Sequence, residues 1–378
     1  MSRKIVFINQ ATGYLTIDII NEFVKEYKKV ALVTGSIRIQ NTQLNSAVII
    51  SPIVKYDRGN NFRKAASWLI GTVQIFFMLQ FRYRDYDKFF FTIPPTAYLL
   101  GSYFRSSFSI VIYDLYPEAL RANGLKENGF LYKWWSNKNK RVFSRAHKIF
   151  TLSENMKSRI LDYSKKADVR VISNWSAFSN LLPVKKYQNG ILKREGLEGK
   201  FIIQYSGNIG VTHNVETLVE AAEALSHIRD LEFQIIGRGE KSKNIREIIE
   251  KKGLTNCDLL PFRKDEELYE SLCAADLAVI TLDNKTSDIS VPSKLYNVLA
   301  AGLPVMVIAP LTSAISEIIL KHQAGKAFEK EDINGMCKFI EELKNNQALK
   351  DKLSANALSA SKKFTSANAA MYLDYYKE

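Results

Sequence analysis

Glycine-containing turns in the second half of the sequence have the residue types that bind phosphate. The turn Tyr205–Gly210, Tyr-Ser-Gly-Asn-Ile-Gly, follows an apolar stretch and precedes a helical pattern that begins near Asn214. The turn Gly237–Glu240, Gly-Arg-Gly-Glu, follows the next apolar stretch and adds the cation Arg238. Glycine lets a ligand approach the backbone, and a helix N-terminus offers N–H donors and positive potential to phosphate. Either turn could simply connect a strand to a helix, but two such turns after neighbouring strands favour a nucleotide site. Their spacing is not G-x-G-x-x-G, which disfavours a dinucleotide cofactor.

A Pro-Ser-Lys segment further along the chain could complete a diphosphate site. It lies in the stretch Val291–Val305, where Pro292 is typical of a first helical turn and Ser290 of a helix cap. Ser293 and Lys294 would then project from that turn, so that a diphosphate could bind the N–H groups beside the ammonium. The alternative is that Lys294 is a solvated surface charge.

The elements that would position these residues form two series of alternating strand and helix patterns. Such alternation is typical of parallel, doubly wound α/β sheets, in which ligands bind outside the carboxyl ends of the strands. The first series predicts a helix at Thr16–Lys28 and strands at Lys4–Asn9, Val30–Thr34, Val48–Ile50, Phe89–Phe91, Ile110–Tyr113, Lys148–Leu152 and Val169–Ile172. The second predicts helices at Asn214–Leu225 and Ser242–Lys252 and strands at Phe201–Tyr205, Glu232–Ile236, Asp258–Leu260, Leu277–Thr281 and Pro304–Ile308. The polar stretch Ser176–Gly199 is interpreted as the linker between two domains, at residues 1–180 and 186–363.

Length and composition exclude several classes of protein. The chain has 378 residues, 46% hydrophobic and 24% charged, which is long for one core and unlike a disordered, collagen-like or membrane-embedded chain. Its three cysteines form no C-x-x-C pair, which excludes a disulfide scaffold and a thiolate zinc site. The first residues contain an apolar run too short for a signal peptide, so we expect a cytoplasmic protein.

The excess of positive charge lies in the first half of the chain. Residues 1–185 contain 28 Lys and Arg against 12 Asp and Glu, whereas residues 186–378 contain 25 against 27. Solubility alone could explain a basic protein. The asymmetry favours a domain that faces a polyanion, which could be an anionic membrane, nucleic acid or phosphorylated substrates.

One apolar segment in this basic half, Ala65–Phe81, could contact a membrane. It is short for a bilayer and polar residues interrupt it, so we expect either a helix buried in the first domain or a helix lying on the membrane surface. The basic and aromatic stretch Tyr132–Arg141 supports membrane contact. The cations that flank the apolar segment are Arg63, Lys64, Arg82 and Arg84.

Six segments, in their order and spacing, resemble the retaining GT-B-fold glycosyltransferases of family 4 over nearly the whole chain. The chain looks most like the branch that builds bacterial surface polysaccharides, including the fucosamine transferases of capsule and O-antigen synthesis. The resemblance implies two Rossmann-like domains facing a central cleft, with a terminal helix at 364–378 that crosses back to the first domain. The matching segments are Asp114–Glu118, Leu152–Met156, Ile172–Trp175, Ser206–Gly210, Val291–Lys294 and Leu299–Pro304.

The resemblance implies that the second domain binds a nucleotide-sugar, expected to be UDP-linked, and that no metal or further cofactor takes part. Protein cations and helix ends would then neutralise the departing diphosphate. Gly13, in the loop after the first strand, could approach the donor diphosphate or the acceptor, or could serve only its turn. The residues expected to bind the donor are Gly13, Gly207, Asn208, Gly210, His213, Arg238, Phe262, Asp288, Ser293, Lys294, Asn297 and Glu317.

Some positions depart from the family pattern. The family's Glu-x7-Glu pair appears here as Ile289, beside Asp288, and Asn297, so we expect Asn297 or Glu317 to hold the ribose.

The family's Arg and Lys after the first strand of the donor domain are here Asn208 and His213. Arg238 and Lys294 would then have to supply the missing positive charge.

The first domain would hold the acceptor. Asp114 and Glu118, which would position or deprotonate the acceptor hydroxyl, are the catalytic candidates together with Lys294. In retaining transfer the hydroxyl attacks the face that the diphosphate leaves, and a diphosphate oxygen can accept its proton, so no protein nucleophile is required. Asp114 could instead be only a turn residue at a strand end, and a His common in the family appears here as Tyr113.

The sequence therefore predicts a cytoplasmic enzyme bound peripherally to the inner face of the cell membrane. It would move a hexosyl or N-acetylhexosaminyl group from a nucleotide-sugar to a lipid-diphosphate-linked saccharide. One alternative is a UDP-sugar 2-epimerase of the same architecture, which would need acid/base carboxylates and His around the cleft. A nucleic-acid-binding protein is suggested by charge alone and has none of the usual motifs, so no nucleic-acid partner is expected.

Overall fold

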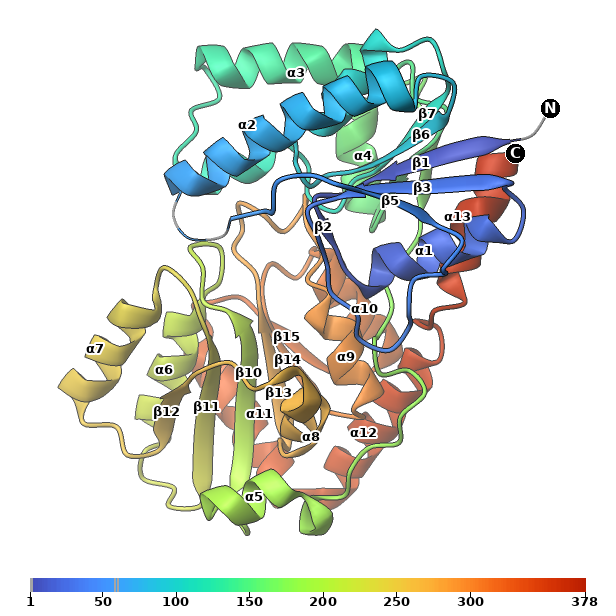
Figure 1. The fold of residues 1–378 in the computed structure, drawn as a ribbon. Helices are drawn as coiled ribbons and strands as arrows, with labels where there is room; N and C mark the ends of the chain where they lie inside the picture. Colours follow the sequence, from blue (N-terminus) through green and yellow to red (C-terminus); the bar gives the residue numbers. More distant parts are fainter. Residues whose placement is uncertain (1–2, 58, 60) are drawn as a thin grey trace. The chain divides into compact units, whose positions relative to one another are not determined.

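The chain folds into two compact units. The computed structural model describes residues 3–57, 59 and 61–378. One unit contains the residues up to Ala177 together with Ser366–Glu378, and the other spans Phe178–Thr365 (Figure 1). Each unit contains one large parallel β-sheet with helices packed against it, which confirms the predicted α/β class.

The sheet of the first unit has the strand order β5-β3-β1-β6-β7-β8-β9, and every pairing in it is parallel. Continuous buried runs such as Ile5–Ile8 form its central strands, as expected for a sheet covered on both faces. All the strands predicted in the first half are present, within a few residues of their predicted bounds. They are β1 (Lys4–Ile8), β3 (Lys29–Thr34), β5 (Ile49–Pro52), β6 (Asp87–Phe91), β7 (Phe108–Val111), β8 (Ile149–Thr151) and β9 (Val169–Val171), and the short strands β2 (Ala11–Thr12) and β4 (Ser36–Ile37) pair separately.

Helices from both ends of the chain cover one face of this sheet. Phe23 of α1 (Tyr14–Val24) lies 5.4 Å, between ring centroids, from Phe89 of β6. Tyr376 of α13 (Asn368–Lys377) lies 5.5 Å from Phe23 and 5.9 Å from Phe89, so α13 completes the core of the first unit. The helices α2 and α3 lie on the other side of the sheet (Figure 1). The remaining helices of this unit are α2 (Asn61–Phe77), its π-helical continuation η1 (Met78–Arg82), η2 (Ala97–Tyr103), η3 (Glu118–Asn123), α3 (Phe130–Phe143) and α4 (Glu154–Tyr163).

The apolar segment Ala65–Phe81 lies in α2 and η1 and is buried on one face only. Ile75 and Leu79 are fully buried, whereas Leu69 and Phe81 on the other face are 67% and 78% exposed. The helix is therefore buried on one face and exposed on the other. The expectation of a helix buried in the first domain is wrong for the exposed face. Within the described ranges, no helix is both long enough and apolar enough to cross a bilayer.

The sheet of the second unit has the strand order β12-β11-β10-β13-β14-β15 and is also parallel throughout. The strands are β10 (Phe201–Asn208), β11 (Leu231–Arg238), β12 (Cys257–Leu260), β13 (Leu277–Thr281), β14 (Val305–Ile308) and β15 (Gly325–Phe328). The sequence pattern does not predict β15, because this short edge strand has no continuous apolar run. The helices and helical turns of this unit are η4 (Lys186–Gln188), α5 (Gly190–Glu195), α6 (Val215–Ala224), α7 (Ser242–Lys252), η5 (Asp265–Glu267), α8 (Leu268–Cys273), α9 (Lys294–Ala300), α10 (Ala314–His322), α11 (Ile333–Asn345) and α12 (Gln347–Ser361).

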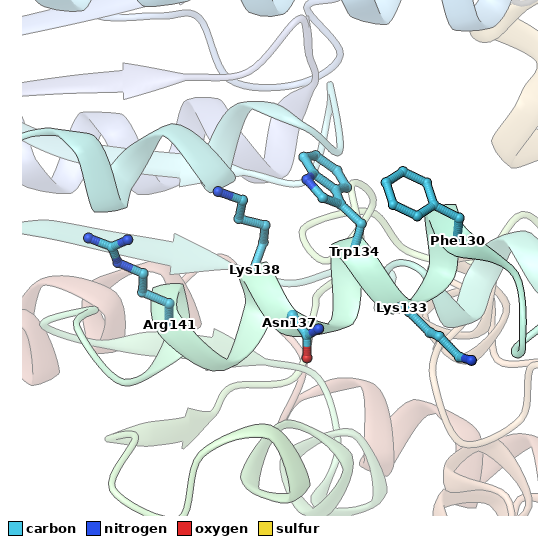
Figure 2. Close-up of a pocket in the computed structure, with 6 residues that line it drawn as sticks. All are labelled: Phe130, Lys133, Trp134, Asn137, Lys138 and Arg141. Atoms are coloured by element: carbon cyan, nitrogen blue, oxygen red, sulfur yellow. The ribbon is translucent and has the colours of Figure 1, made fainter.

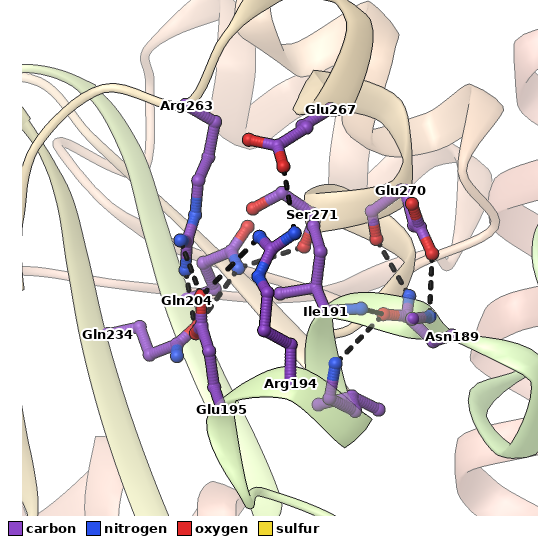
Figure 3. Close-up of polar contacts among 12 residues, drawn as sticks. Asn189, Ile191, Arg194, Glu195, Gln204, Gln234, Arg263, Glu267, Glu270 and Ser271 are labelled. Atoms are coloured by element: carbon purple, nitrogen blue, oxygen red, sulfur yellow. Dashed lines mark hydrogen bonds and ion pairs between the residues drawn. The ribbon is translucent and has the colours of Figure 1, made fainter.

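The stretch Ser176–Gly199 is not the linker that its polar composition indicates. From Phe178 onward it belongs to the second unit, and its polar side chains fasten α5 to the region around α8 (Figure 3). The buried Asn189 caps α5 by accepting from Ile191 N and Leu192 N, and its Nδ2 donates to the Glu270 carbonyl at 2.8 Å. Arg263 donates to both carboxylate oxygens of Glu195, at 2.5 and 2.8 Å. The polar residues are thus partners for one another rather than for water.

Removing the Asn189 side chain should destabilise the second unit. Asn189→Ala removes the cap of α5 and leaves the Glu270 carbonyl without this donor, so we expect a loss of about 2 kcal/mol in the free energy of unfolding. Urea unfolding measures it. Asn346→Ala, which removes the exposed cap of α12, is the matched control and should cost less. An unchanged stability of Asn189→Ala would mean that α5 is detached from the unit.

Candidate functional site

The two predicted glycine turns meet at the carboxyl ends of β10 and β11. The strands pair in register with Gly207 opposite Gly237 and Asn208 opposite Arg238. A Cβ at Gly237 would lie 1.9 Å from the carbonyl oxygen of Gly207, and a Cβ at Gly239 would lie 2.3 Å from that of Ile209. Only glycine allows this approach, so Gly237 and Gly239 first serve the contact between the two turns.

Lys294 reaches the same place from α9. A Cβ at Gly207 would lie 2.8 Å from the Lys294 Nζ, so the ammonium lies against the bare backbone of that strand end. The helix begins at Lys294 itself, with Ser293 at the N-cap position, and not at Pro292 with a Ser290 cap as predicted. The residues before it form a turn instead, in which Leu295 N donates to the Pro292 carbonyl. Because α9 is short, the Lys294 side chain rather than the helix dipole is the main source of positive charge.

The Lys294 ammonium is turned inward. Its Nζ lies 3.8 Å from the centroid of the Tyr205 ring, is buried, and has no hydrogen-bond partner among the described residues. The residue as a whole is half-buried although its ammonium is buried, whereas lysine usually keeps its charged head in water. Burial lowers the pKa of Lys294 to about 7. The alternative of a solvated surface charge is therefore wrong.

His213 is the neutral member of this group. Its ring lies 6.5 Å from the Tyr205 ring, and its Nδ1 lies 3.2 Å from the Thr212 hydroxyl. Burial, and then the charges of Lys294 and Lys241, lower the pKa of His213 to about 3. Lys241 donates to the His213 carbonyl at 2.8 Å and pairs with Glu216 at 2.6 Å. His213 therefore offers a ligand hydrogen bonds without a charge at neutral pH.

Arg238 and Phe262 form an exposed pair at the same edge of the sheet. The Arg238 guanidinium lies 5.7 Å from the centroid of the Phe262 ring, which is 45% exposed. A planar cation and an open aromatic face can both stack on a flat ring of a ligand, and the guanidinium can also bind phosphate.

The structure brings together Gly207, Asn208, Gly210, His213, Arg238, Phe262, Ser293 and Lys294 from the predicted donor residues. Asp288 lies in the turn between β13 and α9, and Asn297 lies three residues after Lys294 on α9. Glu317 is exposed in the first turn of α10, directly after β14. Gly13 precedes α1 in the first unit, where a Cβ would meet no atom within 4 Å.

The two acceptor candidates differ in their surroundings. Asp114 is partly exposed just beyond the carboxyl end of β7. The Glu118 carboxylate accepts a hydrogen bond from Tyr163 of α4, and burial raises its pKa. Glu118 thus bonds to the helical layer of its own unit, whereas Asp114 lies at the end of the sheet and is partly exposed.

Tyr205 and Lys241 belong to the site but are not among the residues predicted from the sequence. Tyr205 is the last apolar residue of a predicted strand and therefore resembles a core residue, and Lys241 lies in an ordinary basic stretch. The signal that could have found Tyr205 is its position directly before the Ser-Gly-Asn turn. Among residues 3–57, 59 and 61–378, no group of three or more His, Cys, Asp or Glu side chains could hold a metal ion.

Comparisons with known proteins agree with this fold. Residues 189–360 match the family described as "Glycosyl transferases group 1". The chain is 24% identical over 353 residues to "Probable glycosyltransferase WbjE" of Pseudomonas aeruginosa, which covers 88% of this chain and 86% of WbjE. It is 29% identical over 157 residues to "Putative colanic acid biosynthesis glycosyl transferase WcaI" of Escherichia coli K12, which covers 41% of this chain and 38% of WcaI.

The fold matches that of HepE from Anabaena in complex with UDP-glucose, with a TM-score of 0.73, 14% identity and 98% of each chain covered. This match confirms the predicted GT-B fold. Both sequence relatives have glycosyltransferase names, so these comparisons do not support the 2-epimerase or nucleic-acid-binding alternatives.

The buried ammonium should make stability depend on pH. The folded-state pKa of Lys294, about 7, lies below its ordinary value of 10.5, so above pH 7 the unfolded chain binds more protons and wild-type stability rises with pH. Lys294→Met should therefore be more stable than wild type at pH 6. Its advantage should shrink by about 1 kcal/mol per pH unit between pH 7 and 9 in urea unfolding. The exposed Lys243→Met is the control, and a pH-independent difference for Lys294→Met would contradict the buried charge.

Proposed function

We propose that this glycosyltransferase, whose residues 189–360 match the family of group 1 glycosyl transferases, transfers a sugar from a UDP-sugar to a lipid-diphosphate-linked saccharide. The observation that carries the proposal is the buried Lys294 Nζ, which lies beside the Gly207 backbone and has no hydrogen-bond partner in the described part of the chain. A buried cation without a partner is costly, and a diphosphate at this strand end would supply the missing partner. The same contact would stabilise the leaving UDP as charge develops on it.

The nucleotide part of the donor fits the remaining groups at this edge. Arg238 would bind the diphosphate from the β11 side, and Phe262 offers an aromatic face to the base. Asn297 or Glu317 would hold the ribose. HepE has been solved with UDP and with UDP-glucose, which supports a UDP-linked donor for this related fold.

The acceptor side of the proposal rests on the first unit. Asp114 would orient or deprotonate the acceptor hydroxyl, and transfer would retain the anomeric configuration without a metal, as in the family 4 enzymes that the sequence resembles. The acceptor would be a polysaccharide precursor at the inner face of a bacterial membrane, within the fucosamine-transferase-like branch. The name of WcaI, which refers to colanic acid biosynthesis, supports a role in surface polysaccharide synthesis.

Donor binding should protonate Lys294. Because its pKa is about 7, the side chain is mostly neutral at pH 8, and an arriving diphosphate should raise the pKa and take up close to one proton. Calorimetry of UDP binding in two buffers of different ionisation enthalpy measures this uptake. Unchanged UDP affinity and proton uptake in Lys294→Met would remove this residue from the site.

A panel of nucleotide-sugars, ranked by the melting temperature that each produces, identifies the donor.

Turnover should depend on Lys294 and not on added metal. Lys294→Ala should lower turnover at least about a hundredfold, as for other lost charge-stabilising donors. Transfer should persist in EDTA, and NMR of the product should show the anomeric configuration of the donor. Loss of all activity in EDTA would contradict the metal-independent mechanism, and inversion would contradict retention.

Asp114→Asn should separate transfer from donor binding. We expect transfer to fall by at least about a hundredfold while UDP affinity is unchanged, because the carboxylate would act on the acceptor. Glu118→Gln, which weakens the bond to Tyr163, should lower the melting temperature more than it lowers turnover. Normal turnover of Asp114→Asn would identify it as a turn residue only.

A further inference from the structure

The outward face of α2 and η1 is apolar. Five of its large side chains, which we call the outer stripe, are between 48% and 82% exposed. Their spacing of seven and then four residues places them along one side of the helix. The outer stripe consists of Phe62, Leu69, Val73, Phe77 and Phe81.

The opposite face of the same helix supplies its contacts with the first unit. Ser67, Gly71, Ile75 and Leu79 recur every four residues there, and all are buried. Gln10 of the first unit donates to the Ser67 carbonyl at 2.8 Å under this face. A surface helix normally turns its polar side to water, so an apolar stripe opposite a fully packed face needs a partner.

Cations surround the outer stripe. Asn61–Arg82 contains Arg63, Lys64 and Arg82 and no Asp or Glu. The turn that follows adds the exposed Arg84. The π-helical turn η1 keeps Phe81 stacked on Phe77, with ring centroids 6.3 Å apart, so the stripe continues to the basic end of the helix.

A second surface of the same character lies on α3, which like α2 packs on η2. Lys138 of α3 lies 5.8 Å from the ring of Tyr103 at the end of η2. One face of α3 lines an open groove of about 440 Å³, and α3 contains no acidic residue (Figure 2). The residues of this α3 groove are Phe130, Lys133, Trp134, Asn137, Lys138 and Arg141.

We propose that the outer stripe and the α3 groove dock the first unit on a bilayer that contains anionic phospholipids. The stripe enters the boundary between headgroups and acyl chains, and Lys133, Lys138 and Arg141 bind lipid phosphates while Trp134 lies at the interface. This docking surface would bring the enzyme to its lipid-linked acceptor. Only the choice of a membrane as the partner rests on the proposed function.

Charge favours a bilayer over a second copy of the chain. Two copies that met through the outer stripe would bring Arg63, Lys64, Arg82 and Arg84 of each copy together with no acidic residue on either helix. An anionic bilayer satisfies the apolar and the basic groups at once.

Vesicle flotation tests the docking surface with the full-length protein. Wild type should bind phosphatidylcholine vesicles that contain phosphatidylglycerol, bind poorly to phosphatidylcholine alone, and lose binding as salt rises. Replacing Leu69, Val73 and Phe77 with Gln should weaken binding at least about tenfold. Replacing Lys133, Lys138 and Arg141 with Gln should weaken it about a hundredfold.

Matched controls come from the second unit. Replacing the exposed Lys243, Arg246 and Lys251 of α7 with Gln removes the same charge, and replacing Leu311 and Leu320 removes exposed apolar groups. Both control variants should bind vesicles as wild type does. Brominated lipid should quench the tryptophan fluorescence of the wild-type protein, and Trp134→Phe should remove most of that quenching, which tests the geometry without altering the stripe.

Several results would overturn the proposal. One is that the Gln replacements in the outer stripe and in the α3 groove both leave vesicle binding at the wild-type level. A second is that the wild-type protein binds neutral and anionic vesicles equally. A third is that sedimentation shows a dimer, which the replacements in the outer stripe dissociate. Sugar transfer to a water-soluble acceptor analogue should be unchanged in every variant of the docking surface. For the wild-type protein, intact transfer without vesicle binding would overturn this inference alone, whereas vesicle binding without any transfer would overturn the proposed function alone.

Discussion

An ammonium group that is held out of water without a hydrogen-bond partner is costly. The Lys294 ammonium, at the carboxyl end of the sheet of the second unit, has no such partner among the residues that the structure describes. Three features make the position of Lys294 possible: the missing side chain at Gly207, the face of the Tyr205 ring, and the short turn that delays the start of α9. The same buried charge helps to keep His213 neutral. The positive charge at this site is therefore not compensated by the protein, which is the physical reason for proposing an anionic ligand.

The fold could be predicted from the sequence because its strands are buried on both faces and appear as continuous apolar runs. Phe201–Tyr205 and Leu277–Thr281 are examples of such runs. The edge strand β15 has a weaker pattern, since an edge is partly exposed. The stretch 176–199 was misleading for a different reason. Its Asn and charged residues find partners such as Glu270 and Arg263 that are far away in sequence, and composition alone does not separate bonded polar groups from solvated ones.

The candidate site was predictable where glycine turns follow strands and less so where tertiary packing decides. Lys294 could be placed near the diphosphate from its segment, but the inward turn of its head depends on Tyr205, which the pattern assigns to the core. Asp114 and Glu118 lie four residues apart in one motif, and the bond from Tyr163 of α4 to Glu118 depends on a helix that the motif does not contain. Local sequence gives residue types at a sheet edge, whereas their protonation and access follow from neighbours supplied by other elements.

The return of α13 to the first unit affects the order in which the protein can fold during synthesis. Tyr372, Leu373 and Tyr376 pack in the same core as Phe7, Phe23 and Phe89, but the ribosome makes them only after the whole of Phe178–Thr365. The second unit can thus close its core while the first still lacks a helix. Until α13 arrives, the apolar side chains of α1 and β6 that it contacts lack these partners, so the nascent first unit presents apolar surface that can aggregate.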